Sequence, residues 1–444
     1  MLIVEGFKEA EAMLSRQLTA VAAPDTPALR LRMKQIFGAE MGAEAAVMRI
    51  IDDVRNKGDD AIRHYTMKID KINLDSLEVE REQVEDAYGE ASSELVSALK
   101  LAAERIKAFH LAQKESICNE VRGEEWGQLV LPLARVGVYA PGGTASYPST
   151  VLMTAIPAKV AGVKEIILVT PPGSNGKVPP STLVAAGIAG VDRIFSIGGA
   201  QAIAALAFGT ESVPKVDKIC GPGNIFVVLA KKVVYGVVDI DGLQGPSEVL
   251  IIADETANPA YCAADLLAQA EHDMLSQAIL VTTSRKLADE VNGEIKRQLN
   301  DLPRRDIAVQ SLKDRGIITV VANLNEALDL ANLYAPEHLE LMVRDTSACI
   351  DRVNNAGCVF IGGNSTVAFG DYIAGPSHVL PTGGTARFSS PLNINDFIKF
   401  IDVVNISDDN LKKLGQAVKT IARAEGLEAH ARAVEKRFEL KNNY

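Results

Sequence analysis

The sequence predicts an α/β protein built on parallel sheets, and three observations support this class. Short apolar runs rich in Val, Ile and Leu alternate with helical segments from Ile166 to Tyr235. A second series of the same kind starts at Val249 and reaches Val343. Glycine turns follow several of the runs, where a strand must pass into a helix. Strands that alternate with helices form βαβ units, and such units pair their strands in parallel.

The expected elements follow from the apolar spacing along the chain. Residues 1–32 are mixed, with Pro24 and Pro27 breaking any long element, and helical spacing then covers residues 44–64 and 81–111. Strands are expected at 129–138, 166–170, 191–197, 216–220, 249–253, 279–283, 316–321 and 339–343. Helices are expected at 181–190, 200–208, 224–235, 258–272, 285–299 and 325–331. From Asn393 the strand pattern is lost, which predicts a helical C-terminal segment.

Composition limits the class of protein and its partners. The chain of 444 residues, 47% hydrophobic and 23% charged, has room for two or three globular domains. Its net charge of −11 argues against nucleic acid or an anionic membrane as the main partner. The N-terminus shows no secretory signal, and the most apolar run, 151–163, is too short to span a membrane. Five cysteines without CxxC spacing suit reduced thiols, so a cytoplasmic location is expected.

The stretch Tyr334–Leu341, Tyr-Ala-Pro-Glu-His-Leu-Glu-Leu, is the main candidate for catalysis. Pro336 disfavours the α conformation at Ala335, so the preceding helix should stop there. The alternation that follows predicts a strand, which places Glu337 and His338 on a short, stiff corner. Two adjacent proton-transfer groups on such a corner are well placed for acid–base catalysis. The alternative is a surface turn with two solvated side chains.

Three glycine turns each follow an expected strand and precede an expected helix: Gly142-Gly143, Gly198-Gly199 and Gly221-Pro222-Gly223-Asn224. Turns of this kind bring backbone N–H groups and a helix N-terminus towards a phosphate. None is a full dinucleotide fingerprint, because Phe226 stands where the third Gly of GxGxxG belongs. Singly, each turn is explained as a tight connection, but three in one series make a nucleotide site an equal alternative.

Four of the six histidines lie beside other groups able to bind a metal or a substrate. The four stretches are Gln269–His272, Glu337-His338, Gly370–His378 and Glu425–His430. Gln269 and His272 are three residues apart on an expected helix and would share a face. Glu425 and His430 would point apart on an unbroken helix, so either Gly426 breaks it or the two residues have different tasks. Gln, His, Asp and His would suit Zn²⁺, although each has a structural alternative.

Five longer motifs occur in a fixed order along the chain. They are Gly-Pro-Ser-Glu-Val-Leu (245–250), Gln-Ala-Glu-His (269–272), Ala-Pro-Glu-His-Leu (335–339), Gly-Asp-Tyr (370–372) and His-Val-Leu-Pro-Thr (378–382). With them, the chain resembles the histidinol dehydrogenase family from residue 30 to residue 435. The resemblance implies two incomplete Rossmann-like domains with helical N- and C-terminal extensions. It also implies a zinc-dependent, NAD-linked enzyme that oxidises L-histidinol through L-histidinal to L-histidine, the last step of histidine biosynthesis. The alternative is a related zinc/NAD dehydrogenase of another small polar alcohol.

The same resemblance implies roles for single residues. The catalytic pair would be Glu337 and His338. The ligands of one zinc ion per subunit would be Gln269, His272, Asp371 and His430. The substrate L-histidinol would contact these four ligands and His338, together with Ser247, His378 and Glu425. The NAD site would be lined by Tyr139, Gln201 and Asn224.

The resemblance further implies a division into domains and a homodimer. The expected parts are an N-terminal extension (1–32), a discontinuous catalytic domain (33–135 and 249–392), an NAD-binding domain (136–248) and a C-terminal arm (393–444). The arm carries Glu425 and His430 as well as an apolar stripe, Leu411, Leu414, Val418 and Ile421. Docking on a second subunit would bury that stripe and complete the neighbouring active site. Folding back onto its own subunit stays open.

Rival mechanisms also stay open from the sequence. Cys220 or Cys358 would allow a thiohemiacetal route, but neither has an adjacent His or Arg to lower its pKa. A zinc hydrolase with Glu337 as base would leave the glycine turns unexplained. A non-catalytic nucleotide-binding protein is the remaining alternative.

Overall fold

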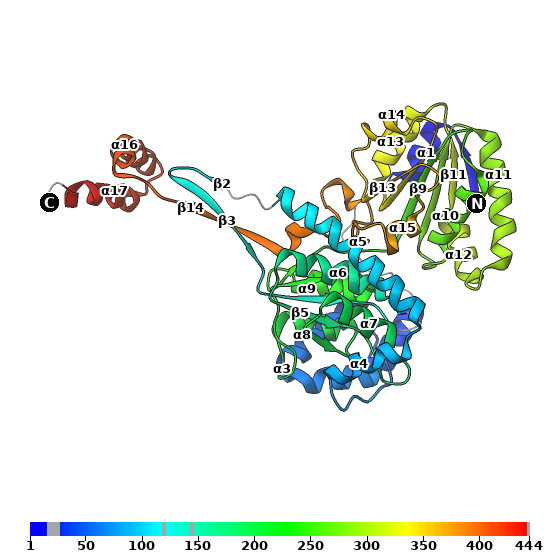
Figure 1. Ribbon diagram of the computed structural model, residues 1–444, viewed down its shortest axis with the longest axis horizontal. Helices are drawn as coiled ribbons and strands as arrows, with labels where there is room; N and C mark the ends of the chain where they lie inside the picture. Colours follow the sequence, from blue (N-terminus) through cyan, green and yellow to red (C-terminus); the bar gives the residue numbers. More distant parts are fainter. Residues whose placement is uncertain (16–26, 118–120, 143–145, 442–444) are drawn as a thin grey trace. The chain divides into compact units, whose positions relative to one another are not determined.

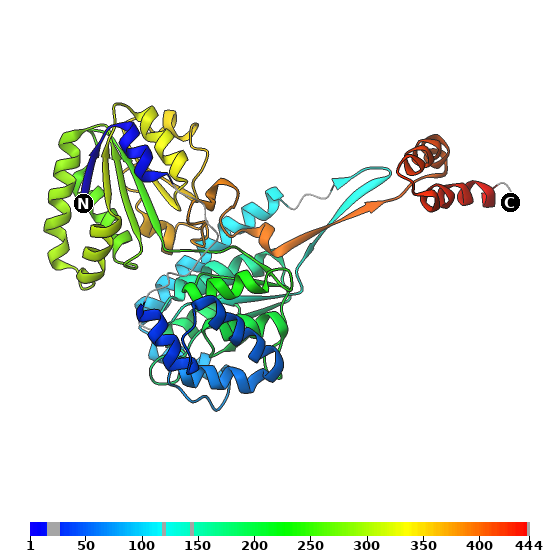
Figure 2. The same cartoon turned by 180° about the vertical axis from the view of Figure 1, so that it is seen from behind.

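The computed structural model describes residues 1–15, 27–117, 121–142 and 146–441. Pro24 and Gly143, both named above, lie outside these ranges. Within the described residues, the strands form two parallel sheets and one antiparallel sheet (Figures 1 and 2). The predicted α/β class is therefore confirmed. The chain divides into two compact units, Met1–Lys114 with Leu133–Phe397, and Glu115–Pro132 with Ile398–Tyr444.

A five-stranded parallel sheet lies in the first unit, with the order β6-β5-β4-β7-β8. Its strands are β4 (Arg135–Tyr139), β5 (Glu165–Val169), β6 (Arg193–Phe195), β7 (Lys218–Cys220) and β8 (Asp239–Ile240). The connecting helices are α6 (Pro148–Ala161), α7 (Pro180–Ala189), α8 (Gly199–Phe208) and α9 (Ile225–Val234). If the strands are numbered by their order in the chain, they lie side by side in the order 3-2-1-4-5. This is the Rossmann order without its sixth strand. The order reverses between β4 and β7, where such sheets bind dinucleotides.

A six-stranded parallel sheet forms the other half of the first unit, with the order β1-β11-β10-β9-β12-β13. Its strands are β1 (Leu2–Glu5), β9 (Glu248–Ala253), β10 (Gln277–Thr282), β11 (Ile317–Val320), β12 (His338–Met342) and β13 (Cys358–Ile361). Five of them repeat the 3-2-1-4-5 order. The sequence predicted neither β13 nor the sixth strand, β1, which pairs with β11 at the edge.

Both faces of the six-stranded sheet are covered by helices (Figure 1). Alternate residues of β9 point to opposite faces: Ile251 packs with one helical layer and Ile252 with the other. The first layer contains α10 (Pro259–Ala270), α11 (Arg285–Gln298) and α12 (Arg305–Arg315). The second contains α1 (Phe7–Leu14), α13 (Leu324–Tyr334) and α14 (Thr346–Ile350). Burial on both faces explains the continuous apolar run that marks β9 in the sequence.

Between α1 and the five-stranded sheet, the described chain forms four helices: α2 (Pro27–Phe37), α3 (Ala43–Ile69), α4 (Arg81–Glu90) and α5 (Ser93–Ile117). The single helix expected at 81–111 is thus two helices, and the strand expected at 129–138 is also divided, into β3 (Trp126–Pro132) and β4. The core of the five-stranded sheet includes apolar residues of α3, such as Val54, together with Leu206 of α8. The domain boundaries expected from the sequence remain a prediction.

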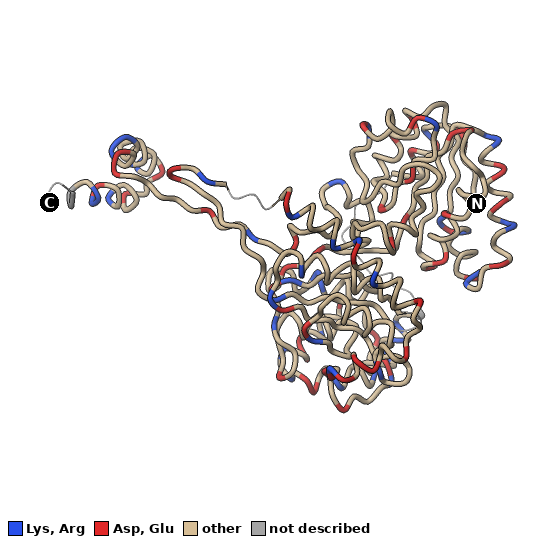
Figure 3. Tube along the Cα trace, in the orientation of Figure 1, with Lys and Arg blue, Asp and Glu red and all other residues tan. Residues whose placement is uncertain are grey.

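The second unit contains the antiparallel sheet and two helices. Strand β14 (Ile398–Val404) pairs with β3, which also pairs with β2 (Val121–Arg122). The helices α16 (Asp408–Ala424) and α17 (Glu428–Lys441) follow. The expectation of a wholly helical segment from Asn393 was therefore wrong, because β14 is a strand. Its side chains after Ile398 are exposed, so its sequence lacks the alternation of apolar and polar residues that marks a half-buried strand. Along the trace, acidic and basic residues are interspersed on the helices (Figure 3).

Candidate active site

The Glu337-His338 corner joins α13 to β12 as the sequence predicted. The helix ends at Tyr334, and its capping residue Ala335 adopts the left-handed conformation with φ of 52°. This conformation is unfavourable for a residue with a Cβ atom, so the surrounding structure must hold it. The chain turns at once, and His338 is the first residue of β12. Glu337 and His338 are both buried, with 6% and 3% of their surfaces exposed.

The corner lies at the amino ends of the strands of the six-stranded sheet. His338 is in register with Val249 near the start of β9 and with Cys358 at the start of β13. Open parallel sheets more often bind ligands beyond the carboxyl ends of their strands. The candidate site therefore lies at the opposite ends of the strands, the amino ends. The strand pattern of the sequence did not predict this placement.

The carboxylate of Glu337 is held by the segment that enters β9. Its Oε2 atom accepts hydrogen bonds from Ser247 Oγ at 2.5 Å and from the Glu248 N–H at 2.9 Å. Burial raises the pKa of Glu337 well above its usual range, although these two hydrogen bonds act in the opposite direction. Ser247, expected to touch substrate, is thus also a partner of the candidate base.

The imidazole of His338 is fixed by its Nδ1 atom, which lies 3.0 Å from the backbone oxygen of Glu248. Because a carbonyl oxygen only accepts, this bond places the imidazole proton on Nδ1 and leaves the lone pair on Nε2. Nε2 lies 3.8 Å from Oδ1 of Asp371. Burial lowers the pKa of His338, while the charge of Asp371 raises it. The neutral imidazole therefore presents a proton acceptor on the side of Asp371.

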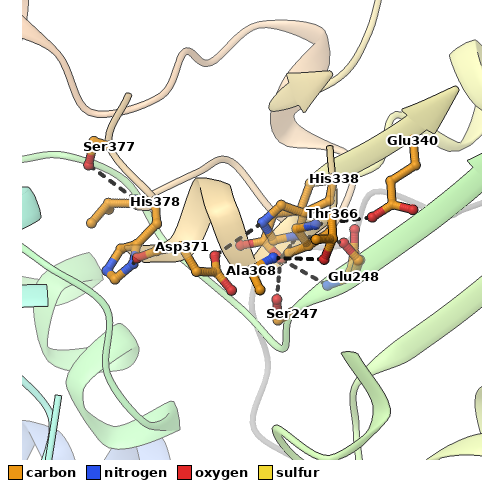
Figure 4. Close-up of polar contacts among 12 residues, drawn as sticks. Ser247, Glu248, His338, Glu340, Thr366, Ala368, Asp371, Ser377 and His378 are labelled. Carbon is orange, nitrogen blue, oxygen red and sulfur yellow. Dashed lines mark hydrogen bonds and ion pairs between the residues drawn. The ribbon is translucent and has the colours of Figure 1, made fainter. Parts of the chain in front are cut away.

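Asp371 lies on the short helix α15 (Val367–Tyr372). Its backbone oxygen is 2.8 Å from Nδ1 of His378, whose Nε2 is 3.2 Å from the Thr150 hydroxyl at the start of α6. By the same reasoning His378 is protonated on Nδ1, so its Nε2 accepts from Thr150. Figure 4 shows Asp371 between His338 and His378. These three residues line a cavity of about 440 Å³.

The residues expected to bind metal lie on different elements. Gln269 is on the last turn of α10, but the helix ends at Ala270, so His272 lies beyond it and the shared helix face was wrong. Gln269 is 2% exposed, and both polar atoms of its amide lack a hydrogen-bond partner among the described residues. A buried amide without a partner costs free energy unless a ligand satisfies it. Among the described residues no cluster of three His, Cys, Asp or Glu forms a metal site by itself.

Two of the residues expected to bind NAD lie at or after the ends of β4 and β7, the neighbouring strands at which the order of the five-stranded sheet reverses, and the third follows β6 at its edge. Tyr139 ends β4, and its hydroxyl accepts the Gly199 N–H at 3.1 Å. Gln201, in the first turn of α8, is fully buried, and within the described part of the chain neither polar atom of its amide has a hydrogen-bond partner. Asn224 follows β7 and caps α9 through its Oδ1 atom, at 3.0 Å from the Phe226 nitrogen. Rossmann-type sheets bind dinucleotides at such a reversal of strand order, so the assignment of these residues to NAD stays a prediction.

Glu425 and His430 belong to the second unit. Glu425 caps the C-terminus of α16, Gly426 follows with φ of 76°, and His430 lies in the first turn of α17. The helix is therefore broken at Gly426, which was one of the two alternatives that the sequence left open.

Comparison with known proteins decides the family. The sequence model of the family described as histidinol dehydrogenase matches residues 37–438. A histidinol dehydrogenase of Dehalococcoides mccartyi (strain CBDB1) is 58% identical over 99% of this chain and 100% of its own length. One of Deinococcus radiodurans is 50% identical, also over 99% and 100%. The crystal structure of histidinol dehydrogenase from Elizabethkingia anophelis aligns with a TM-score of 0.90 and 37% identity, covering 100% of this chain and 99% of that one.

The chain belongs to the histidinol dehydrogenase family. The resemblance stated from the motifs is thereby confirmed, as is the expected class of NAD-dependent oxidoreductase. Within the described residues, no helix is long and apolar enough to cross a membrane.

Sequence reasoning missed several groups that shape this histidinol dehydrogenase site. Glu248 binds both members of the candidate catalytic pair, and Thr150 contacts His378. Glu340, two residues after His338 on β12, accepts the N–H of Val367 at 3.2 Å at the start of α15 and interacts with Asp265 of α10. Because side chains alternate along a strand, Glu340 could have been predicted from the sequence to lie on the same face of β12 as His338.

The cysteine route finds no support in the geometry. Cys220 is fully buried, and burial raises the pKa of its thiol well above the usual range. Cys358 lines the cavity, but burial and the charge of Asp371 raise its pKa to about 11. Neither thiol is poised to form a thiolate near neutral pH.

Proposed function

We propose that this chain catalyses the zinc-dependent, NAD-linked, four-electron oxidation of L-histidinol via L-histidinal to L-histidine. The observation that carries the proposal is the pair of differently held bases at one corner. His338 is neutral with its lone pair on Nε2, and Glu337 is a buried carboxylate held by Ser247 and Glu248. Two proton acceptors side by side match a reaction with two successive oxidations. The cytoplasm, with its reduced thiols, is the proposed location.

The residues present fit a zinc ion. The unpartnered amide of Gln269, together with His272, Asp371 and His430, would supply the nitrogen and oxygen ligands that zinc accepts. When bound, zinc would grip the amino alcohol, and NAD would accept hydride in both oxidations. NAD would lie against Tyr139, Gln201 and Asn224.

In the first oxidation, His338 would take the hydroxyl proton of histidinol at Nε2. The bond from Nδ1 to the Glu248 oxygen stabilises the imidazolium that forms, because the donor becomes more acidic. Asp371, 3.8 Å from Nε2, adds a favourable charge. His378 and Glu425 would orient the substrate from either side of its polar groups.

In the second oxidation, Glu337 would activate water for attack on the aldehyde. Its Oε2 atom is engaged by Ser247 and by the Glu248 N–H, so Oε1 is the oxygen directed to the reacting water. The buried environment raises the basicity of this carboxylate, which makes it a better proton acceptor than a solvated Glu. Hydration converts the aldehyde into a diol that can lose a second hydride.

A homodimer with a shared active site is part of the proposal, as are the domain boundaries expected from the sequence. The second unit exposes apolar side chains on both of its parts. They include Trp126, Phe400 and Val404 on the sheet and Leu414, Val418 and Ile421 on α16. Several exposed apolar side chains on one arm favour docking on a partner subunit. The arm would bring Glu425 and His430 to the neighbouring site.

The substrate is tested by NAD reduction with purified, zinc-loaded protein. L-Histidinol should be oxidised with formation of L-histidine, identified by mass spectrometry. Amino alcohols without an imidazole, such as leucinol, should be turned over far more slowly. Efficient turnover of another polar alcohol with none of histidinol would instead support the related dehydrogenase named as the alternative.

A further inference from the structure

The ammonium group of Lys231 is buried within the half of the first unit that holds the five-stranded sheet. The side chains of Lys231 and its partner Asp241 are each only 1% exposed. The Lys231 Nζ atom donates to three oxygens: Gly221 O at 3.1 Å, Asp241 Oδ1 at 2.5 Å and Gln244 Oε1 at 2.9 Å. These acceptors use all three ammonium protons, so the buried cation is fully satisfied.

The Lys231–Asp241 pair fixes the first residue of the Gly221–Asn224 turn from both sides. Asp241 Oδ2 accepts the Gly221 N–H at 2.7 Å, while Lys231 binds the Gly221 oxygen. Gly221 has φ of 111°, and a Cβ atom there would lie 2.2 Å from the backbone oxygen of Tyr139. The turn thus depends on a glycine pressed against β4 and held at both of its backbone groups.

The residues that follow Gln244, and that lead to the proposed substrate site, are held by other contacts. The Gly245 N–H donates to Thr382 Oγ1 at 2.6 Å, and Ser247 is bound to Glu337. A buried ion pair is a costly way to gain stability, since apolar residues of similar volume often serve as well. What an ion pair adds is the direction of its hydrogen bonds, and here those bonds end on the turn.

We propose that Lys231 is a positioning residue for NAD: with Asp241 it holds the Gly221–Asn224 turn in the shape that receives the dinucleotide. This inference rests on the proposed function. Lys231 itself touches neither NAD nor histidinol. Its effect passes through the Gly221 backbone to Asn224 and the N-terminus of α9, which begins directly after the turn.

The test compares three variants of the full-length, zinc-loaded protein. Lys231→Met removes the clamp but leaves Asp241 buried and unpaired. The double variant Lys231→Met/Asp241→Leu removes both charges, and thus separates loss of the clamp from an unpaired charge. Lys218→Met is the matched control, because Lys218 is a buried lysine of β7 in the same sheet, paired with Asp239 at 3.0 Å and Asp396 at 2.9 Å. NAD binding is measured by calorimetry, stability by urea unfolding, and KM for each substrate by steady-state kinetics.

Both Lys231 variants should bind NAD roughly ten- to a hundredfold more weakly, with KM for NAD raised and KM for histidinol changed by less than about threefold. The double variant should regain stability but not NAD affinity. Unchanged NAD binding in both variants, recovery of NAD affinity in the double variant, or an equal loss in Lys218→Met would each overturn the proposal. Wild-type protein that binds no NAD would overturn the proposed function itself, before any variant is compared.

Discussion

The Nδ1 atom of His338 lies 3.0 Å from the backbone oxygen of Glu248, and this contact decides which imidazole nitrogen can act as a base. The same residue donates its N–H to Glu337 at 2.9 Å. One backbone position at the start of β9 therefore orients both side chains proposed to be catalytic. Because backbone groups keep their place when side chains change, the two bases have a fixed relationship to each other.

His338→Asn should slow the hydride step from histidinol by roughly 10²–10⁴-fold, the usual contribution of a proton-transfer group. An Asn amide can keep a hydrogen bond to the Glu248 oxygen but has no basic nitrogen. Single-turnover NADH formation measures this step directly. The exposed His64 on α3 gives the control, His64→Asn, which should retain wild-type rates. A loss under about threefold in His338→Asn would mean that the imidazole is only structural.

Removal of metal should abolish activity, and added Zn²⁺ should restore it. His272→Asn should lower the zinc content measured by elemental analysis after dialysis against a competing chelator, because one ligand is lost. His64→Asn again serves as control and should hold zinc like the wild type. Full activity in rigorously metal-free protein would contradict the zinc assignment.

The buried carboxyl pair behind the site predicts a pH-dependent stability. Burial and the charge of Asp265 raise the pKa of Glu340, and burial raises the pKa of Asp265. A carboxyl whose pKa is raised by folding contributes its full stability below the unfolded pKa and loses it as pH rises through the folded value. Glu340→Gln has no such proton to lose. The free energy of unfolding of Glu340→Gln minus that of wild type should therefore rise as the pH rises, by at most about 1.4 kcal/mol per pH unit.

Urea unfolding at intervals from pH 5 to pH 9 measures this difference. Glu82→Gln, at an exposed position of α4, is the matched control and should track the wild type at every pH. A constant difference between Glu340→Gln and wild type over this range would show that Glu340 is ionised in the folded protein.

Subunit sharing predicts complementation between two inactive variants. His430→Ala and His338→Ala proteins are mixed under conditions that allow exchange of subunits. If the arm acts in trans, each mixed dimer contains one site with both histidines intact, and activity returns. If exchange is verified with tagged subunits and activity stays at zero, the arm works within its own subunit.

Much of the first unit was predictable from the sequence because both of its sheets are buried on both faces. Runs such as Val249–Ile252 are apolar throughout and mark the strands clearly. The corner at Glu337 was also predictable, since Pro336 and the alternation after it limit the backbone. The motifs then located His338 and Ser247 without any fold.

Other features were hidden because they depend on contacts between distant segments. Strand β14 is exposed on most of its length, so burial left no pattern in its sequence. Thr150 reaches His378 only because α6 and the segment after α15 meet in space. The position of the site at the amino ends of β9 and β12 follows from strand order, which a single sequence does not state.

The central claim is that one site carries out two oxidations, with Glu337 needed for the second. The direct measurement is the NADH formed per histidinol consumed, in wild type and in Glu337→Gln, with the products identified. Wild type should form two NADH and histidine for each histidinol. Glu337→Gln should form close to one, with histidinal released, because the amide cannot activate water. One NADH from wild type, or two from Glu337→Gln at the wild-type rate, would contradict this account.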